Sequence, residues 1–218
     1  IMNSLLLAPI ALPTLAGLTC LFLPRRANLV RQILALLSTT ISLGIAGYIL
    51  AARDLRLTLP WLSLGQTLTV PFDLLAGRFA SLIVLAASAF AFLIAIYSLR
   101  YMADHPRQAE HYAYLLLTLG MAAGAALANN LLLFLLFWDL LAVLLYAMVT
   151  LGGRAAIPGA NKTLIIIGTA DLALLLGITL LWHTSGTLSM SELTATPQAL
   201  TGWMPTTAYL LILAGALA

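Results

Sequence analysis

Two acidic side chains lie inside long apolar segments, and they are the residues best suited to chemistry. Asp139 follows eight apolar residues, and Asp171 lies within the apolar run 164–182. An Asp at the centre of a membrane helix costs about 3 kcal/mol to insert, so such residues usually serve ion or proton movement. Burial favours the neutral carboxyl and a nearby cation favours the charged one, so the group can bind and release a proton. Asp139 and Asp171 are therefore predicted to form part of a proton relay.

A structural role is the alternative for both carboxyls, which could instead anchor neighbouring helices by hydrogen bonds. Thr163 and Thr169 lie near enough in sequence to satisfy Asp171 locally. On the helical face of Asp139, only Tyr146 offers a polar group, two turns further on. We expect Asp139 about 12 Å from the outer end of its span and Asp171 about 10 Å from the inner end of its own. At these depths the two carboxyls could share a hydrated path.

Lys162 precedes the span of Asp171 at the expected inner boundary of the membrane. A lysine there either reaches the lipid headgroups or admits protons to the relay. The three histidines lie scattered at span ends, and Cys20 is the single cysteine. Neither a disulfide nor a thiolate metal site can be assembled from one cysteine. We expect this chain to bind no metal and no cofactor.

The composition indicates a helical membrane protein. Hydrophobic residues make up 62% of the 218 positions and charged residues 8%, against about a quarter charged in soluble domains. Apolar runs of about 18 to 24 residues match the thickness of a bilayer, and their continuous character predicts helices rather than barrel strands. The expected fold is an all-α, polytopic transmembrane bundle. No polybasic run is present, so nucleic acid is excluded as a partner.

The apolar runs predict six complete spans and an incomplete seventh within one transmembrane domain, 1–218. The predicted spans are 4–23, 29–52, 78–99, 111–128, 131–151, 164–182 and 206–218. A run of about 13 residues makes roughly 20 Å of helix, which is too short to cross a bilayer. We therefore expect a fragment of a longer protein or a truncated product.

The distribution of basic residues predicts the orientation, because cytoplasmic loops carry an excess of Lys and Arg. One side carries seven, namely Arg25, Arg26, Arg31, Arg100, Arg107, Arg154 and Lys162, and the other carries three, namely Arg53, Arg56 and Arg78. This asymmetry places the amino terminus outside, in a bacterial-type inner (plasma) membrane or an organellar inner membrane.

Two further features concern packing. The loop 53–77 is the longest polar break, and its alternating residues around Pro60 and Gly65 favour a short external hairpin. In the fourth span Gly120, Gly124 and Ala128 recur four apart on one face. Such a ridge of small residues lets another helix backbone approach closely, and packing is the role that we expect for it.

Three segments together resemble one family, the antiporter-like membrane subunits. These subunits are shared by proton-pumping NADH:quinone oxidoreductase, membrane-bound nickel-iron hydrogenases and Mrp-type cation/proton antiporters. The segments read YSLRYM at 97–102, NNLLLFLLFWDLLAVLLY at 129–146 and NKTLIIIGTADLALLLGI at 161–178, the last followed by GTLSMSEL at 186–193. The resemblance extends from about Pro71 to the end of the sequence.

The resemblance implies roles for individual residues. The family carries an acid on its fifth transmembrane helix, where Asp139 stands in place of glutamate, and pairs it with a basic residue on a broken seventh helix. This sequence ends where that helix would deliver its lysine. Gly168 stands where some members place an arginine ahead of the acid matching Asp171, so a tight ion pair there is not expected. Any iron-sulfur, flavin or nickel-iron centre would belong to partner subunits.

The predicted function is the amino-terminal part of a proton-translocating subunit in a redox-driven membrane complex, such as a quinone-linked NADH dehydrogenase or a hydrogenase. Such a subunit carries no redox chemistry itself, and its partners are the lipid bilayer and other membrane subunits. One alternative is an Mrp-type antiporter subunit, which moves protons and sodium without a redox partner. The other is a truncated, non-conducting subunit with a structural role only.

Overall fold

The computed structural model describes residues 3–24, 27–52, 55–64, 68–103, 105–195 and 202–217. The apolar runs form helices, as a backbone surrounded by hydrocarbon requires. The helices are η1 (Asn3–Leu7), α1 (Ala8–Phe22), α2 (Asn28–Ala52), α3 (Arg78–Tyr101), α4 (Gln108–Leu127), α5 (Leu131–Thr150), η2 (Arg154–Ala156), α6 (Ile157–Ser185), α7 (Met190–Ala195) and α8 (Trp203–Leu217). Several residues used in the sequence predictions lie outside the described residues, namely Arg25, Arg26, Arg53, Gly65 and Ala218.

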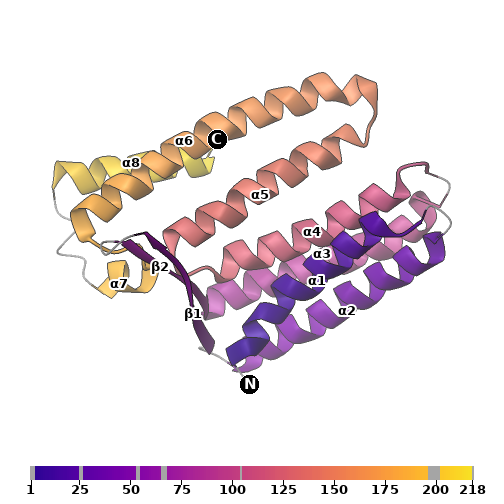
Figure 1. Ribbon diagram of the computed structural model, residues 1–218, viewed down its shortest axis with the longest axis horizontal. Coiled ribbons are helices and arrows are strands. Elements are labelled where there is room, and N and C mark those ends of the chain that lie inside the picture. Colours follow the sequence, from indigo (N-terminus) through magenta and orange to yellow (C-terminus); the bar gives the residue numbers. More distant parts are fainter. Residues whose placement is uncertain are drawn as a thin grey trace.

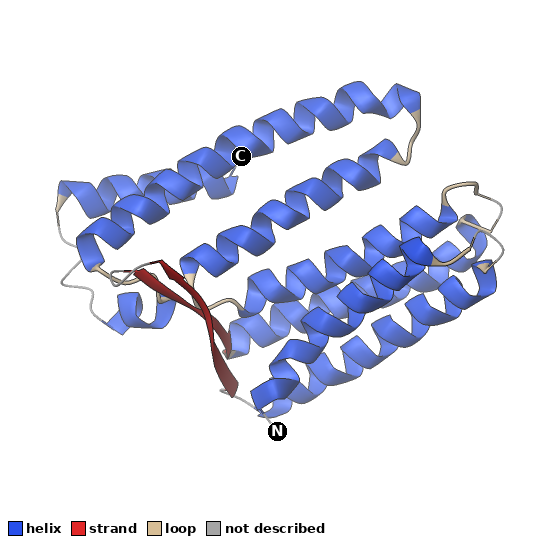
Figure 2. Ribbon diagram, in the orientation of Figure 1, coloured by secondary structure: helices blue, strands red, loops and turns tan. Residues whose placement is uncertain are grey.

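The long helices lie side by side, and one small sheet crosses their ends (Figures 1 and 2). Helix α1 packs against α2 and α4, and α2 packs against α3. Helix α4 then contacts α5, α5 contacts α6, and α6 contacts α8. Most of the chain is therefore helical, as predicted, with α5, α6 and α8 on one side of the group formed by α1 to α4.

Five helices in the described residues are long and apolar enough to cross a membrane. They are Asn3–Phe22, Asn28–Ala52, Arg78–Tyr101, Leu131–Thr150 and Arg154–Ser185. Helix α4 has 20 residues but is not among the five, and α8 has 15 residues, or about 22 Å of helix. The predicted count of six complete spans and a truncated seventh is therefore not confirmed.

Helix α6 differs most from its predicted span. It begins at Ile157, seven residues before the predicted start at 164, and carries a proline in its first turn, where proline is well tolerated. Gly186 ends it with φ of 71° and donates its backbone N–H to Trp182 O. The predicted span began only after the polar pair Asn161 and Lys162. The helix includes both residues, because a helix can extend beyond the hydrocarbon layer. The short helix α7 was not predicted.

Arg31 is buried rather than exposed in a loop. Its side chain is only 1% exposed. Its guanidinium donates to Cys20 O at 3.2 Å, to Leu23 O at 2.5 Å and to Pro24 O at 2.9 Å. A cation bonded to the last carbonyls of a helix also meets the negative end of the helix dipole. Arg31 therefore caps the end of α1, a role that the loop count did not anticipate.

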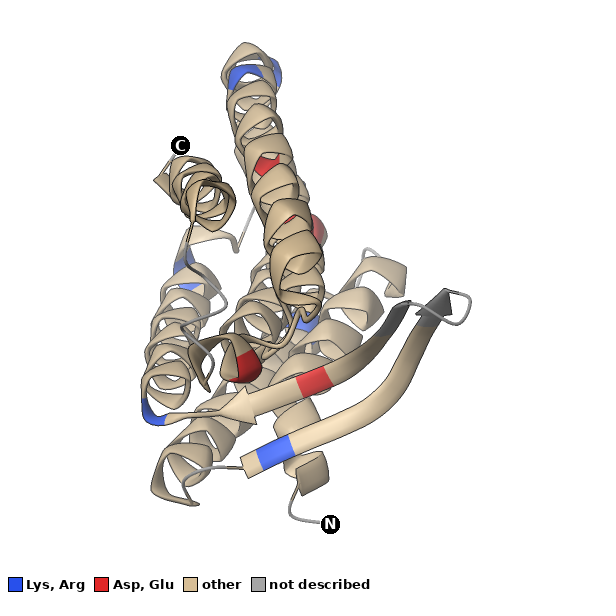
Figure 3. Ribbon diagram, turned by 90° about the vertical axis from the view of Figure 1, so that its left-hand side faces the viewer, with Lys and Arg blue, Asp and Glu red and all other residues tan. Residues whose placement is uncertain are grey.

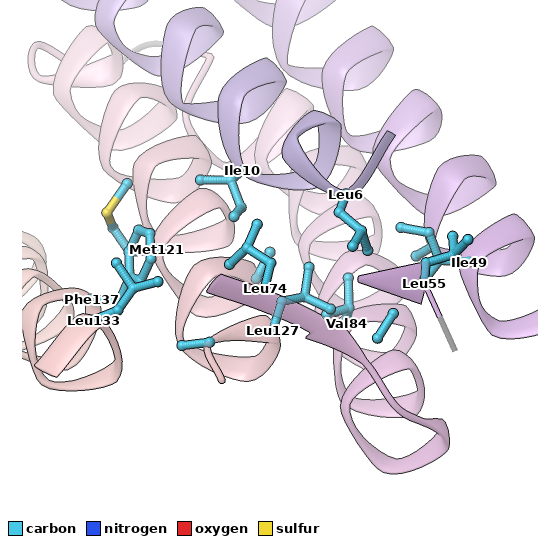
Figure 4. Close-up of a cluster of buried hydrophobic side chains, with 14 residues drawn as sticks. Leu6, Ile10, Ile49, Leu55, Leu74, Val84, Met121, Leu127, Leu133 and Phe137 are labelled. Atoms are coloured by element: carbon cyan, nitrogen blue, oxygen red, sulfur yellow. The ribbon is translucent and has the colours of Figure 1, made fainter. Parts of the chain in front are cut away.

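The segment 53–77 contains an antiparallel hairpin of β1 (Leu55–Leu64) and β2 (Leu68–Ala76). The register is irregular between Pro60 and Leu62. Apolar hairpin side chains cover a buried cluster at the helix ends, shown in Figure 4. Leu55 and Leu74 of the hairpin lie there with Leu6, Val84 and Leu127 of the helices. Burial of these side chains holds the hairpin on the bundle.

A buried polar group, the Asp73 cluster, joins the hairpin to the helices. Asp73 is 2% exposed and accepts hydrogen bonds from Arg56 at 2.8 and 3.0 Å, Thr58 at 2.8 Å and Asn129 at 2.6 Å. Asn129, between α4 and α5, also donates to Ser191 Oγ of α7 at 3.0 Å. Burial raises the pKa of Asp73, but the hydrogen bonds and the charge of Arg56 outweigh burial and hold this pKa below its ordinary value.

The Asp73 cluster also fixes the start of α5. Asn129 N–H donates to Asp73 O at 2.9 Å, and Met190 N–H donates to Asn129 O at 2.7 Å. The next residue, Asn130, caps α5, because its Oδ1 accepts from Leu132 N at 2.9 Å and Leu133 N at 3.4 Å. The position of α5 along its own axis is therefore set by the hairpin and α7.

Replacing Asp73 with Ala is expected to destabilise the protein by about 1 to 3 kcal/mol, because buried donors on Asn129 and Thr58 lose their acceptor. The contribution of the Asp73 carboxyl to stability depends on pH. A carboxyl whose pKa is lower in the folded protein stabilises it above about pH 4, and this stabilisation is lost as pH falls through the folded pKa. Thermal unfolding of the purified protein in detergent at several pH values measures both effects.

The matched control is Glu110→Gln. Glu110 pairs with Arg107 at the other end of the bundle, where the side chains are 34% and 35% exposed, and such pairs contribute about 1 kcal/mol or less. An Asp73→Ala protein as stable as the control would contradict this account of the hairpin.

Candidate functional site

Helices α5 and α6 bring Asp139 and Asp171 together. The two carboxyl groups lie close enough to interact electrostatically. Trp138, the residue before Asp139, donates its indole Nε1–H to Asp171 Oδ1 at 3.0 Å. We refer to Asp139 and Asp171 as the carboxyl pair. Two side chains 32 positions apart in sequence, each predicted as a relay residue, thus form one site.

The proximity of the two carboxyl groups affects their protonation. An ionised carboxylate offers only hydrogen-bond acceptors, so a hydrogen bond between two carboxyl groups needs a proton on one of them. Two like charges at such short range also disfavour double ionisation. The arrangement can therefore store one proton between two helices, and the Trp138 N–H stabilises the form in which Asp171 carries the charge.

Both carboxyls lie far from the helix ends. Asp171 is 14 residues from each end of α6, which is about 21 Å of helix. Asp139 is eight residues from the start of α5, or about 12 Å. Figure 3 shows acidic positions partway along the helices as well as at the hairpin and α7. The site is therefore separated from the loops by several helical turns.

Asp139 and Asp171 differ in exposure. Asp171 is half-buried, whereas Asp139 is exposed on the surface of the described chain. A charged group facing lipid at this depth is strongly disfavoured, so intramembrane carboxyls usually face protein or water. The carboxyl pair thus lies at an edge of the chain, with Asp139 on the open side.

The other predicted relay residues do not join the pair. Lys162 is exposed and lies nine residues before Asp171 on α6, about 14 Å along the axis. Tyr146 is half-buried and makes no hydrogen bond with Asp139 in the part of the chain that the structure describes. Thr163 and Thr169 donate to carbonyls of their own helix, Gly159 O and Ile166 O. Asp171 is hydrogen-bonded by Trp138 rather than by these threonines.

Sequence reasoning missed Trp138. Adjacent residues on a helix point about 100° apart, so Trp138 was not considered among the residues that share the helical face of Asp139. A helix that packs against α5 between these two directions can contact both side chains. Helix α6 packs in this way, and its Asp171 accepts the hydrogen bond from Trp138 and interacts with Asp139. The only signal in the sequence was a buried indole N–H, which usually needs an acceptor.

A pocket of about 370 Å³ adjoins the carboxyl pair. It lies between α4, α5, α6 and α8 and is mostly apolar. Its lining residues are Thr118, Trp138, Leu141, Ala142, Leu145, Ile167, Ala170, Asp171, Gly215 and Ala216. Asp171 therefore lines the pocket, whereas Asp139 is not among the lining residues.

Glycines set the spacing of the helices around this site. A Cβ on Gly177 would lie 2.8 Å from Ala208 O, and one on Gly215 would lie 2.7 Å from Ala170 O, so α6 and α8 are in close backbone contact. The predicted packing glycines of α4 face different neighbours. Gly120 meets Ile10 O of α1 at 2.9 Å, and Gly124 meets the Phe137 ring of α5. The ridge thus serves two helices instead of one.

Among the described residues, no group of three or more His, Cys, Asp and Glu side chains could hold a metal ion. His111 instead lies 2.8 Å from the Ser98 hydroxyl, measured from Nε2 to Oγ.

Residues 128–218 match the family described as NADH:quinone oxidoreductase/Mrp antiporter, TM. The sequence is 28% identical over 195 residues to one of the Na(+)/H(+) antiporter subunits of Bacillus subtilis (strain 168), covering 88% of this chain and 39% of that protein. It is 32% identical over 126 residues to a Na(+)/H(+) antiporter subunit of Staphylococcus haemolyticus (strain JCSC1435), covering 57% of this chain and 16% of the relative. The chain thus spans well under half the length of these relatives.

Two solved structures share the fold. One is the Mrp complex from Dietzia sp. DQ12-45-1b, with a TM-score of 0.80 at 20% identity over 100% of this chain and 23% of that chain. The other is the membrane-bound sulfane sulfur reductase, an archaeal respiratory membrane complex, with a TM-score of 0.77 at 20% identity over 98% and 44% of the two chains. The resemblance inferred from the sequence motifs is confirmed by these matches.

Replacing Gly177 with Ala is expected to lower stability by about 1 to 3 kcal/mol, because a new methyl group would push α8 away from α6. Gly168→Ala is the matched control, since a Cβ at this position of the same helix meets nothing within 4 Å. Thermal unfolding in detergent compares the two variants. Equal stability of both would refute the close packing of α8 at the pocket.

Proposed function

We propose that this antiporter-like membrane subunit moves protons along a path that includes the carboxyl pair of Asp139 and Asp171. The observation that carries the proposal is the approach of two carboxyl groups from neighbouring helices, several turns from either helix end. Such a pair takes up one proton readily and resists losing it entirely, because the fully ionised pair places two like charges together.

The surroundings of the pair support a relay with two openings. Asp171 faces the pocket, and Asp139 faces the exposed side of α5. When the proton resides on Asp139, the Trp138 indole N–H stabilises the charge on Asp171. When the proton moves to Asp171, Asp139 carries the negative charge on the exposed side of α5. A cation or a protonated group approaching Asp139 would therefore draw the negative charge to Asp139 and the proton to Asp171.

Lys162 and Tyr146 are proposed as more distant members of the same path. Lys162 lies near the start of α6, where an exposed ammonium can exchange protons with water. Tyr146 lies about 10 Å beyond Asp139 along α5. Water is needed to connect either group to the pair, because neither side chain touches it among the described residues.

The variant Lys162→Gln tests whether Lys162 belongs to the proton path. Unchanged proton transport in this variant would show that Lys162 is not part of the path.

The arrangement in the membrane follows from the same features. We propose that α4 spans the bilayer as a sixth helix, because it lies among α1, α2, α3 and α5 and its 20 residues reach about 30 Å. We also propose that the hairpin and the amino terminus lie outside a bacterial inner membrane, and the excess of basic residues at the opposite end supports this orientation. A membrane-impermeant label that reached the hairpin only from the cytoplasm would overturn this orientation.

Two assemblies could contain such a subunit. The first is a redox-driven complex, in which iron-sulfur, flavin or nickel-iron centres belong to partner subunits. The second is a cation/proton antiporter, favoured by the names of the Bacillus and Staphylococcus relatives. Proton movement in membrane vesicles driven by a sodium gradient without any electron donor would favour the second, and a strict need for a donor would favour the first.

Asp139→Asn in the full protein is expected to reduce proton transport at least tenfold, because the amide keeps the shape of the side chain but cannot take up a proton. Transport is measured with a pH-sensitive dye in inverted membrane vesicles. Asp139→Glu, which keeps the ionisable group, is expected to retain most of the activity.

The amount of assembled complex in the same membranes is the control for folding. Full transport by an assembled Asp139→Asn protein would refute the proposed path.

A further inference from the structure

Phe137 of α5 packs its ring against a glycine of α4 and an aromatic side chain of the hairpin. It is 6% exposed and belongs to the same buried cluster as Met121 and Leu133 (Figure 4). A Cβ on Gly124 of α4 would lie 2.5 Å from the ring atom Cε1. The ring also packs against Phe72 of β2, with the centroids 6.4 Å apart and the ring planes at 75°. The position of the Phe137 ring is therefore restricted by both α4 and the hairpin.

The residues that follow Phe137 on α5 belong to the carboxyl site. Trp138 comes directly after it and donates to Asp171, and Asp139 comes next. Successive residues of a helix point about 100° apart, so Phe137 and Asp139 lie on nearly opposite sides of α5. A rotation of this helix that moves the Phe137 ring also moves the Trp138 indole and the Asp139 carboxyl. The orientation of both groups therefore depends on where the Phe137 ring lies.

The Trp138 indole is itself fixed relative to α5. Its ring stacks on Phe134, with the centroids 5.6 Å apart and the planes at 29°, because residues four apart are neighbours on a helix surface. The direction of the indole N–H thus follows the rotation of the helix. The bond from Nε1 to Asp171 Oδ1 is 3.0 Å long. Such bonds extend to about 3.2 Å, so a displacement of about 1 Å would break this one.

We propose that Phe137 is a positioning residue for proton transfer at the carboxyl pair. Contacts with Gly124 and Phe72 hold its ring in place. The ring in turn keeps α5 in the rotation at which Trp138 donates to Asp171 and the two carboxyls approach each other. The inference rests on the proposed function and adds that the hairpin and α4 act on the carboxyl pair through one buried ring.

The test combines Gly124→Ala with Phe137→Leu in the full protein. Carbon atoms pack about 3.5 to 4.0 Å apart, so the new methyl group would displace the ring by about 1 Å and turn α5 with it. Proton transport per assembled complex in vesicles should fall about tenfold in Gly124→Ala and about threefold in Phe137→Leu, which has no ring to hold the rotation. The double variant should match Phe137→Leu, because the methyl group then meets a smaller side chain. Gly44→Ala is the matched control, since a Cβ there meets nothing within 4 Å.

A spectroscopic measurement separates positioning from packing alone. The infrared carbonyl-stretch band of the protonated carboxyl should shift in both single variants and stay unshifted in Gly44→Ala, because only the former change the hydrogen bond from Trp138. A purely structural role for Phe137 would lower the amount of assembled complex but leave the band and the transport per complex unchanged.

The possible failures are distinguishable. A tenfold cost of Gly124→Ala that persisted beside Phe137→Leu would overturn the inference, since the clash would then not involve the ring. If Gly124→Ala does not assemble, Phe137→Leu decides, and wild-type transport with an unshifted band in that variant would overturn the inference. In both cases Asp171→Asn would still lose transport. Full transport by an assembled Asp171→Asn protein would instead refute the proposed function itself.

Discussion

The approach of the Asp139 and Asp171 carboxyl groups to each other is the constraint on which the proposed mechanism depends. The other side chains that pack between α5 and α6 are largely apolar, among them Leu135, Leu174 and Ile178. The carboxyl pair and the Trp138 indole restrict α5 and α6 to a rotation in which polar groups meet. The same restriction gives the site its chemistry, because two adjacent carboxyls hold one proton more readily than none or two.

The second polar region, the Asp73 cluster, supports the first from a distance. It joins the hairpin, the turn before α5 and α7 through Asp73, Asn129 and Ser191. These contacts fix where α5 begins, and the Asn130 cap fixes its first turn. Since Asp139 lies eight residues further along a rigid helix, its depth follows from that anchor. The hairpin thus contributes to the site without touching it.

The sequence predicted the positions of the helices well but did not predict the contacts between them. Apolar runs predicted most helix boundaries within about three residues, because the length of a hydrophobic segment reflects the membrane directly. Asp139 and Asp171 were identified because an acid in such a run is conspicuous. Their approach to each other and the Trp138 hydrogen bond depend on helix rotation, which a strongly apolar helix does not encode in its periodicity. Asp73 was missed because an acid in a polar loop looks ordinary.

The most direct test of the central claim is a double-mutant comparison of proton transport in assembled complexes. Asp139→Asn, Asp171→Asn and the double variant are compared with wild type in the same vesicles. If the two carboxyls act as one proton-binding unit, the double variant loses no more than the stronger single variant, since residues that act together are strongly non-additive. Losses that multiply in the double variant would show two independent groups and would contradict the account.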